Sequence, residues 1–269
     1  MDILKGLILG IVQGITEFLP VSSSGHLLLL EKITGISEND GGAFFTTMLH
    51  LATLVAVVIV YRKLIWKVIR YPKNKLLLYL VIATVPTVII ALLFKTVLSG
   101  FSDMADRGAF LGISFIITSV LLLLSDKLAS IPKRRRKLEN MSPKDALIIG
   151  AMQCVGTLPG ISRSGSTISG AIFAGLDKSA AADFSFLMSI PAILGSVVLE
   201  GYDAVKAGTI GVPVGMLIVG MIAAGITGYF AVKFMITMIK KKKLFGFAIY
   251  TAALGVIVII DQLVTHIVF

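Results

Sequence analysis

Two hydroxyl-rich segments interrupt strongly apolar sequence, and the first combines the groups that nucleophilic catalysis needs. Residues 17–26 read EFLPVSSSGH, so a carboxylate and an imidazole stand on either side of three serines. A serine near a histidine is the minimum for nucleophilic attack, with the histidine oriented by a carboxylate. We predict Ser23 as the nucleophile, His26 as its base and Glu17 as the orienting group. The reverse assignment, with His26 as the nucleophile and Ser23 as its helper, fits the sequence equally well.

The second segment carries the residues expected of an anion site. Residues 159–167 read PGISRSGST, in which proline and glycine break a helix and the hydroxyls suit the start of the next one. The N–H groups at a helix start and the planar guanidinium of Arg163 both favour phosphate oxygens, and Arg163 would also stabilise charge during the reaction. The predicted phosphate-binding residues are Arg163, Ser162, Ser164, Gly165, Ser166, Thr167, Ser22 and Ser24. The alternative is a capped turn in which Arg163 only pairs with Glu17.

A cation site is predicted at Gln13 and Glu17, which lie four residues apart and would share one helix face. They offer too few ligands for a dedicated metal cage. Mg²⁺ or Ca²⁺ could instead bind jointly to these residues and to substrate phosphates. A further histidine in apolar sequence, His50, is expected only to hydrogen-bond a neighbouring helix.

The two segments are copies of one motif. Four pairs of residues recur at a spacing of 140 positions: Gly10 and Gly150, Gln13 and Gln153, Ser22 and Ser162, Gly25 and Gly165. Superimposing the copies places Ser23 opposite Arg163, and His26 opposite Ser166. If the copies meet tip to tip, a nucleophile and base on one copy face a cationic anion site on the other. That arrangement suits phosphoryl transfer, in which positioning and charge neutralisation dominate.

The composition indicates an all-α integral membrane protein. The 269 residues are 56% hydrophobic and 15% charged, with a mean hydropathy of +0.94. Apolar runs near the roughly 20 residues that cross a bilayer predict full spans at 43–61, 76–98, 108–125, 183–200, 210–232 and 245–263. Segments 3–33 and 145–176 are interrupted by Pro, Gly and Ser, and each predicts a re-entrant helix–loop–helix hairpin. Non-helical backbone at that depth must be buried in protein or line a wet cavity.

The basic residues predict the orientation of these segments. Most of the 25 lysines and arginines fall at 62–75, 126–144 and 233–243, which the positive-inside rule assigns to the cytoplasm. The loops near 36–42, 99–107 and 200–209 are then outside, so the two hairpins enter from opposite sides. This placement favours contact with membrane lipids and excludes nucleic acid as a partner.

The predicted architecture is a single membrane domain, 1–269, built from two inverted-topology repeats. The first repeat covers about 1–125 and the second about 144–269, with a basic cytoplasmic linker at 126–143. Each repeat is one re-entrant hairpin plus three transmembrane helices. Because three is odd, the second repeat is inserted upside down.

The paired motifs resemble those of the bacterial undecaprenyl-diphosphate phosphatase family, also called the bacitracin-resistance proteins. The resemblance rests on Gln13-x-x-x-Glu17, on residues 20–26 (PVSSSGH) and on residues 159–165 (PGISRSG), and it extends to residues 180–186 (AAADFSF) and to the chain length. It assigns the family's acidic motif to Gln13 and Glu17, its serine to Ser23, its histidine to His26 and its arginine to Arg163. Many members have Glu at the position of Gln13, so any metal scheme depends here mainly on Glu17.

The resemblance implies hydrolysis of undecaprenyl diphosphate to undecaprenyl phosphate and inorganic phosphate. This reaction would take place at the outer face of the bacterial cytoplasmic membrane, recycle the lipid carrier for peptidoglycan synthesis and give bacitracin resistance. A divalent cation and a homodimer are also implied. The alternative function is a flippase or transporter of anionic polyprenyl lipid or phosphate, because inverted repeats with interrupted helices are typical of transporters.

Overall fold

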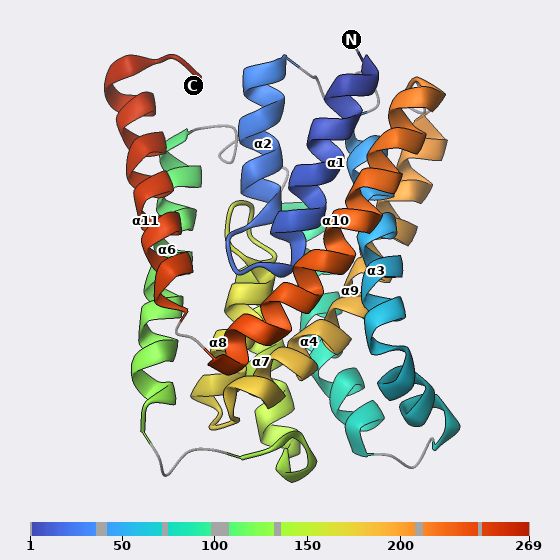
Figure 1. Ribbon diagram of the computed structural model, residues 1–269, viewed down its shortest axis with the longest axis vertical. Coiled ribbons are helices and arrows are strands. Elements are labelled where there is room, and N and C mark those ends of the chain that lie inside the picture. Colours follow the sequence, from blue (N-terminus) through green and yellow to red (C-terminus); the bar gives the residue numbers. More distant parts are fainter. Residues whose placement is uncertain are drawn as a thin grey trace.

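The described part of the chain is helical. The computed structural model (Figure 1) describes residues 2–35, 42–71, 75–97, 108–131, 136–207, 212–241 and 244–268, and these ranges contain no strand. The helices are α1 (Asp2–Phe18), α2 (Ser23–Thr34), α3 (Gly42–Arg70), α4 (Lys75–Val97), α6 (Gly108–Ala129), α7 (Pro143–Gly156), α8 (Arg163–Phe173), α9 (Lys178–Ala207), α10 (Val214–Lys241) and α11 (Phe245–Ile260). A short 3₁₀ turn at Leu138–Asn140 and a π-helical turn at Asp261–Thr265 complete the set.

Five helices are long and apolar enough to cross a membrane. They are Phe44–Arg70, Gly108–Ala129, Lys178–Asp203, Val214–Ile239 and Phe245–Thr265. Five of the six predicted spans are thereby confirmed, and the chain is a helical multi-pass membrane protein. The sixth, predicted at 76–98, forms α4, whose described apolar part, Lys75–Ile90, is shorter than the others.

The two interrupted segments form helical hairpins. The first hairpin consists of α1 and α2, which are broken at residues 19–22, and the second consists of α7 and α8, which are broken at residues 157–162. In Figure 1 the first hairpin descends from the upper end, where the N-terminus lies, and the second rises from the lower end. Pro20 and Pro159 explain the breaks, because the residue before a proline avoids helical backbone. Gly160 adds a positive φ of 80° to the second turn.

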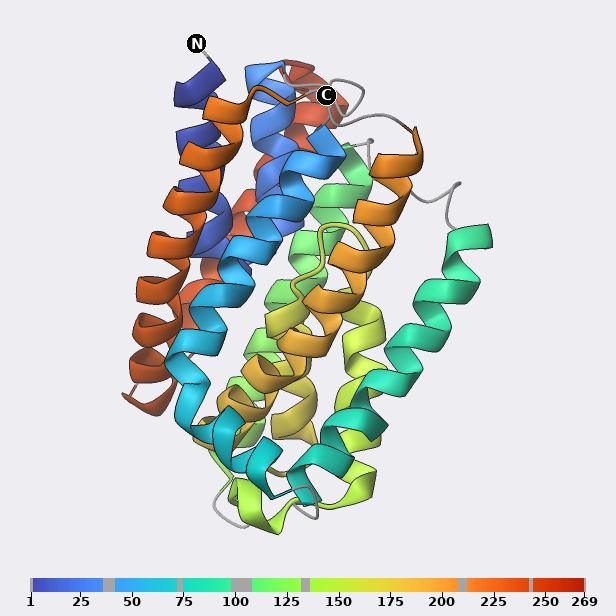
Figure 2. The same ribbon diagram turned by 90° about the vertical axis from the view of Figure 1, so that its right-hand side faces the viewer.

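The helix ends agree with the predicted charge pattern. The C-terminal ends of α3, α6 and α10 and the N-terminal ends of α4, α7 and α11 lie toward the lower end of the molecule in Figures 1 and 2, and both chain termini lie toward the upper end. The described helix ends that flank the three basic segments therefore lie toward one end of the molecule. Of the loops predicted to be outside, 99–107 and all but residue 42 of 36–42 fall outside the described residues. In the third, 200–209, residues 200–207 form the end of α9 and residues 208–209 are not described.

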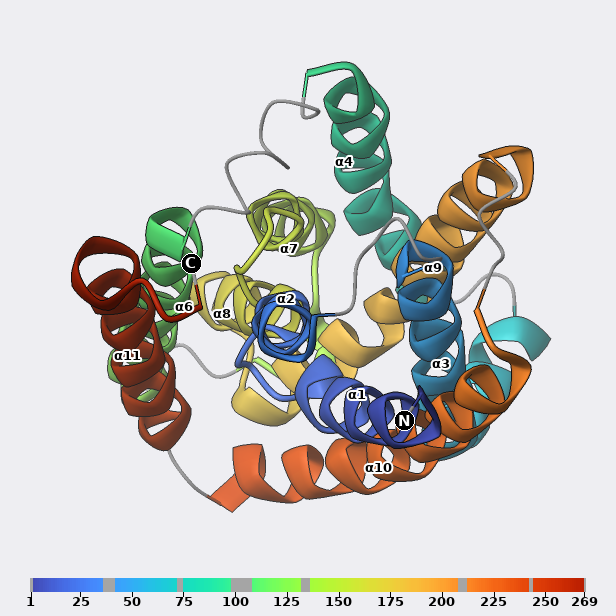
Figure 3. The same cartoon turned by 90° about the horizontal axis from the view of Figure 1, so that it is seen from above.

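The hairpins occupy the centre of the helix arrangement, with the long helices around them (Figure 3). Glycines allow this close approach. A Cβ at Gly10 of α1 would lie 2.2 Å from the carbonyl oxygen of Gly220 in α10, and one at Gly150 of α7 would lie 2.5 Å from that of Ala83 in α4. Small residues at helix contacts are typical of membrane proteins, where backbones approach closely. Gly10 and Gly150, which are equivalent positions of the repeated motif, thus each allow the first helix of a hairpin to pack closely against a long helix.

Candidate active site

The tips of the two hairpins touch, as the tip-to-tip hypothesis requires. The hydroxyl of Ser164 donates to the carbonyl oxygen of Leu19 at 2.9 Å, and the N–H of Gly160 donates to the hydroxyl of Ser24 at 3.4 Å. The second tip is also fixed to α6, because the N–H of Ser162 donates to the Thr118 hydroxyl at 3.0 Å. The two copies of the motif therefore form one polar cluster.

Each serine at the start of a second hairpin helix caps that helix. The Ser22 hydroxyl accepts from the N–H of Gly25 at 3.2 Å, and the Ser162 hydroxyl accepts from the N–H of Gly165 at 3.0 Å. The caps differ in backbone shape, since φ is 73° at Ser22 and −71° at Ser162. A positive φ at a residue other than glycine costs of order 1–3 kcal/mol, and such strain gathers at functional sites.

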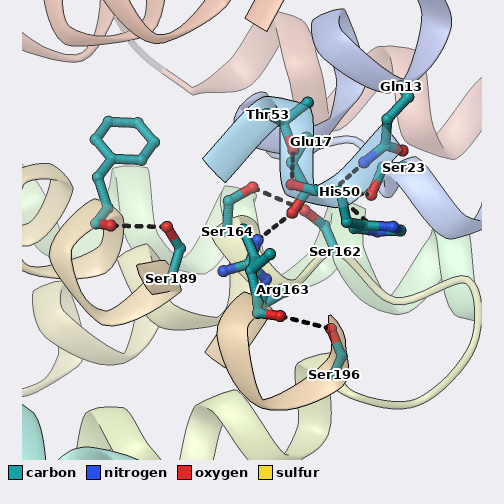
Figure 4. A network of polar contacts seen from close by, with 12 residues as sticks. Gln13, Glu17, Ser23, His50, Thr53, Ser162, Arg163, Ser164, Ser189 and Ser196 are labelled. Carbon is teal, nitrogen blue, oxygen red and sulfur yellow. Dashed lines mark hydrogen bonds and ion pairs between the residues drawn. The ribbon is translucent and has the colours of Figure 1, made fainter. Parts of the chain in front are cut away.

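Glu17 is the centre of the cluster (Figure 4). Its Oε2 accepts from Nε2 of Gln13 at 2.9 Å and from the hydroxyl of Ser23 at 2.7 Å, and its Oε1 accepts from Nη2 of Arg163. Glu17 is only 5% exposed. The arrangement brings a buried carboxylate, a hydroxyl and a guanidinium from both hairpins into direct contact. The ion pair between Glu17 and Arg163 is also the contact expected if the second segment were only a capped turn with Arg163 paired to Glu17.

His50 of α3 joins this cluster, although the sequence predicted only a contact to a neighbouring helix. Its Nε2 lies 3.5 Å from Oε2 of Glu17, and its Nδ1 lies 2.8 Å from the carbonyl oxygen of Thr46. The only hint in the sequence was a histidine inside an apolar span, because nothing in the spacing from Glu17 to α3 reveals that the two meet.

Ser23 and His26, predicted as nucleophile and base, each hydrogen-bond to other groups in the structure. Both ring nitrogens of His26 have other partners: Nδ1 lies 2.6 Å from the carbonyl oxygen of Ser22, and Nε2 lies 2.6 Å from the hydroxyl of Tyr250 in α11. Ser23 instead donates to Glu17. Residues three apart near a helix start share a face, which is why the sequence paired these two. In the structure the Glu17 carboxylate instead binds the Ser23 hydroxyl and turns it toward α1.

The remaining predicted phosphate-binding residues lie at the start of α8. The hydroxyls of Ser162 and Ser164 lie 3.2 Å apart, and that of Thr167 lies 2.5 Å from the Ser185 hydroxyl in α9. The Ser166 hydroxyl is buried and has no hydrogen-bond partner within the described ranges. The N–H of Gly165 already donates to the Ser162 hydroxyl, so an anion beside Arg163 would be bound by the N–H groups of Arg163 and Ser164, which come before it at the start of α8.

A protein-only metal cage is absent from the described residues, where no group of three His, Cys, Asp or Glu side chains could hold an ion. Glu17 already accepts from several donors. Gln13, however, is fully buried, and its Oε1 has no hydrogen-bond partner among the residues described. An amide oxygen of this kind suits Mg²⁺ or Ca²⁺, which prefer oxygen ligands. The residues thus fit a cation that arrives with phosphate, and they do not fit one held by protein alone.

Comparison with known proteins identifies the family. Residues 6–257 match the family described as "Bacitracin resistance protein BacA". The chain belongs to the BacA family. It is 46% identical to "Undecaprenyl-diphosphatase" of Carboxydothermus hydrogenoformans over 268 residues, which cover 97% of this chain and 98% of that protein. It is 42% identical to "Undecaprenyl-diphosphatase 4" of Bacillus thuringiensis strain Al Hakam, over 99% of this chain and 100% of the relative. The predicted resemblance is confirmed, and in this BacA-family chain it covers both hairpins.

Proposed function

We propose that the protein hydrolyses undecaprenyl diphosphate to undecaprenyl phosphate and inorganic phosphate, and so recycles the lipid carrier for peptidoglycan synthesis and gives bacitracin resistance. The relatives named undecaprenyl-diphosphatase support the substrate. The observation that carries the chemistry is the contact of Ser23 and Arg163, from opposite hairpins, with one buried carboxylate. This cluster combines a hydroxyl nucleophile, a proton acceptor and a phosphate-binding cation.

In the proposed reaction, the Ser23 hydroxyl attacks the terminal phosphorus and its proton passes to Glu17. The bond from that phosphorus to the bridging oxygen breaks, and undecaprenyl phosphate leaves with the bonding electrons. Arg163 turns from Glu17 to the phosphate oxygens and, with the N–H groups at the start of α8, stabilises the developing negative charge. Water then attacks the phosphorus of the phosphoserine and gives a proton to His26. The bond from phosphorus to the Ser23 oxygen breaks, inorganic phosphate leaves, and Glu17 returns its proton to that oxygen. Glu17 replaces His26 as the group that activates Ser23, because it is the group that Ser23 contacts.

His26 keeps a role in this scheme as the base for the water step, with Nδ1 oriented by the Ser22 carbonyl. The variant in which His26 itself attacks phosphorus uses the same nitrogen, Nε2. Mapping a trapped phosphoenzyme separates the two: label on Ser23 supports the scheme above, and label on His26 supports the variant. Label on neither residue would leave water as the attacking group.

A divalent cation is part of the proposal as a companion of the substrate. Glu17 and the free amide oxygen of Gln13 would hold it. The chemistry that Mg²⁺ or Ca²⁺ supplies when bound is neutralisation of phosphate charge. The protein's own groups still bind, orient and deprotonate.

The membrane arrangement that we propose follows from the two hairpins. They would be re-entrant halves of inverted repeats in the bacterial cytoplasmic membrane, with the site opening toward the outer face. Their entry from opposite ends in Figure 1 and the matched glycine contacts of α1 and α7 support this. Cysteine-accessibility labelling from either side tests the orientation. We also propose a homodimer, which mass measurement in detergent tests.

The decisive experiment measures phosphate release from undecaprenyl diphosphate by purified protein. Ser23→Ala, Glu17→Gln and Arg163→Ala should each lose at least about 100-fold in kcat/KM, the scale expected for a catalytic hydrogen bond or charge. Ser196→Ala is the matched control, because its hydroxyl donates to the carbonyl of Ile193 in its own helix. Near-normal activity of Arg163→Ala would refute the two-hairpin site.

Transport of anionic polyprenyl lipid is the second candidate, favoured by hairpins that enter from opposite ends. It predicts lipid binding without phosphate release. Release of phosphate in detergent, where no membrane separates two sides, supports hydrolysis and leaves transport unnecessary for the reaction.

A further inference from the structure

Tyr250 contacts His26, the histidine of the first motif. It lies on α11, a helix of the second half of the chain, and its hydroxyl is 2.6 Å from Nε2 of His26. The two rings are stacked, with centroids 5.6 Å apart and an angle of 14° between their planes. Phe115 of α6 also packs edge-on against His26, with ring centroids 5.5 Å apart. Three elements therefore fix this imidazole.

The hydrogen bonds assign the proton positions on His26. The Ser22 carbonyl oxygen, 2.6 Å from Nδ1, can only accept, so Nδ1 carries the proton. In the neutral ring Nε2 then has a lone pair, and the Tyr250 hydroxyl donates to it. In many catalytic histidines, a backbone carbonyl accepts a hydrogen bond from Nδ1–H and so fixes the tautomer in which Nε2 is the basic nitrogen.

The Ser22 carbonyl that faces Nδ1 of His26 belongs to a residue with a strained backbone. Ser22 has a φ of 73°, while its counterpart Ser162 in the other repeat has −71°. The second copy has no histidine, because Ser166 stands at the position of His26. The strain thus occurs only in the copy that has an imidazole to orient, and Tyr250 completes the orientation from α11.

We propose that Tyr250 is a positioning residue for the reaction, whose hydroxyl holds the Nε2 lone pair of His26 in the orientation and tautomer that the water step uses. The inference rests on the proposed role of His26. It makes α11 part of the catalytic unit, although no residue of α11 belongs to either motif. In this role the hydrogen bond from Tyr250 to Nε2 breaks when His26 accepts the proton from water, and it forms again after that step.

The test is a double-mutant cycle in phosphate release. Tyr250→Phe keeps the stacked ring and removes only the hydroxyl, so we expect kcat to fall about tenfold, within the range of one hydrogen bond, with KM changed less than about twofold. In a His26→Ala background the same change should have no further effect, measured with enzyme in excess over substrate. Tyr229→Phe is the control, because the Tyr229 hydroxyl contacts Lys233 on the same helix.

The outcomes separate the inference from the function beneath it. A loss on Tyr250→Phe that persists in His26→Ala would overturn the positioning role and leave the proposed function intact. Full activity of His26→Ala would overturn both roles assigned to that histidine. Nitrogen-15 NMR of the labelled imidazole gives a readout independent of rate: Nδ1 should carry the proton, and the Nε2 resonance should shift in Tyr250→Phe. A ring protonated only on Nε2 would refute the assignment.

Discussion

Replacing Gln13 by glutamate tests the charge balance of the site directly. Nε2 of Gln13 lies 2.9 Å from Oε2 of Glu17, so Gln13→Glu brings two carboxylates to about that separation. At an effective dielectric constant of about 20, two like charges at this distance repel by about 6 kcal/mol. Protonation of one of the two carboxylates costs less free energy than this repulsion. Keeping a carboxyl of ordinary pKa about 4.3 neutral at pH 7 costs about 4 kcal/mol.

We therefore expect Gln13→Glu to lose up to about 4 kcal/mol of unfolding free energy at pH 7 without divalent cations. Because the folded pair takes up a proton that the unfolded chain does not, this loss grows as pH rises above about 4.3 and levels off above the folded pKa. Mg²⁺ or Ca²⁺ should restore stability, since a cation relieves the same repulsion.

Thermal unfolding in detergent, with chelator or with either cation, measures these effects. Gln153→Glu is the matched control: Gln153 is fully buried and donates to the Thr87 hydroxyl at 2.9 Å, with no carboxylate as a recorded partner. It should lose stability that added cation does not recover. Equal stability of Gln13→Glu and wild type in chelator at neutral pH would refute the reasoning, because the predicted repulsion would be missing.

Three further predictions concern the supports of the site. Ser22→Gly should raise the unfolding free energy by about 0.5–1 kcal/mol, because glycine adopts a positive φ without strain. Ser162→Gly, at a position with an ordinary φ, should lower the unfolding free energy by a few tenths of a kcal/mol. Denaturant titration measures both changes, and the same sign for both variants would contradict strain at Ser22. Gly150→Ala should lower the unfolding free energy by about 1–3 kcal/mol, because the added Cβ would overpack against α4. A Cβ at Gly195 would have no neighbouring atom within 4 Å, so Gly195→Ala should stabilise its helix by up to about 1 kcal/mol. Melting temperatures of the two variants that shift in the same direction would contradict this prediction. Burial raises the pKa of Asp145, but hydrogen bonds from an arginine and a serine outweigh it and hold that pKa below its usual value. Its stabilisation is therefore complete above the usual pKa of about 3.9 and is lost as pH falls through the folded value, so Asp145→Asn should destabilise at pH 7 and progressively less in acid.

The sequence alone predicted the helices and the two breaks. Apolar runs, prolines and hydroxyl caps act within one turn of the chain, so their effect is readable from neighbours. The 140-residue repeat aligned Ser22 with Ser162, and in the structure each of these serines caps the helix that follows it. The condition under which the two copies would form one site, that their tips meet, is fulfilled in the structure.

The partners of the site residues were decided only by the tertiary structure. The sequence placed Ser23 with His26, three residues apart, but Ser23 bonds to Glu17 and His26 to Tyr250, which lies 224 positions away. His50 reaches Glu17 from a third helix without any signal in the spacing. The physical reason is that local sequence fixes which face of a helix a side chain occupies, while the rotation and depth of packed helices decide what that face meets.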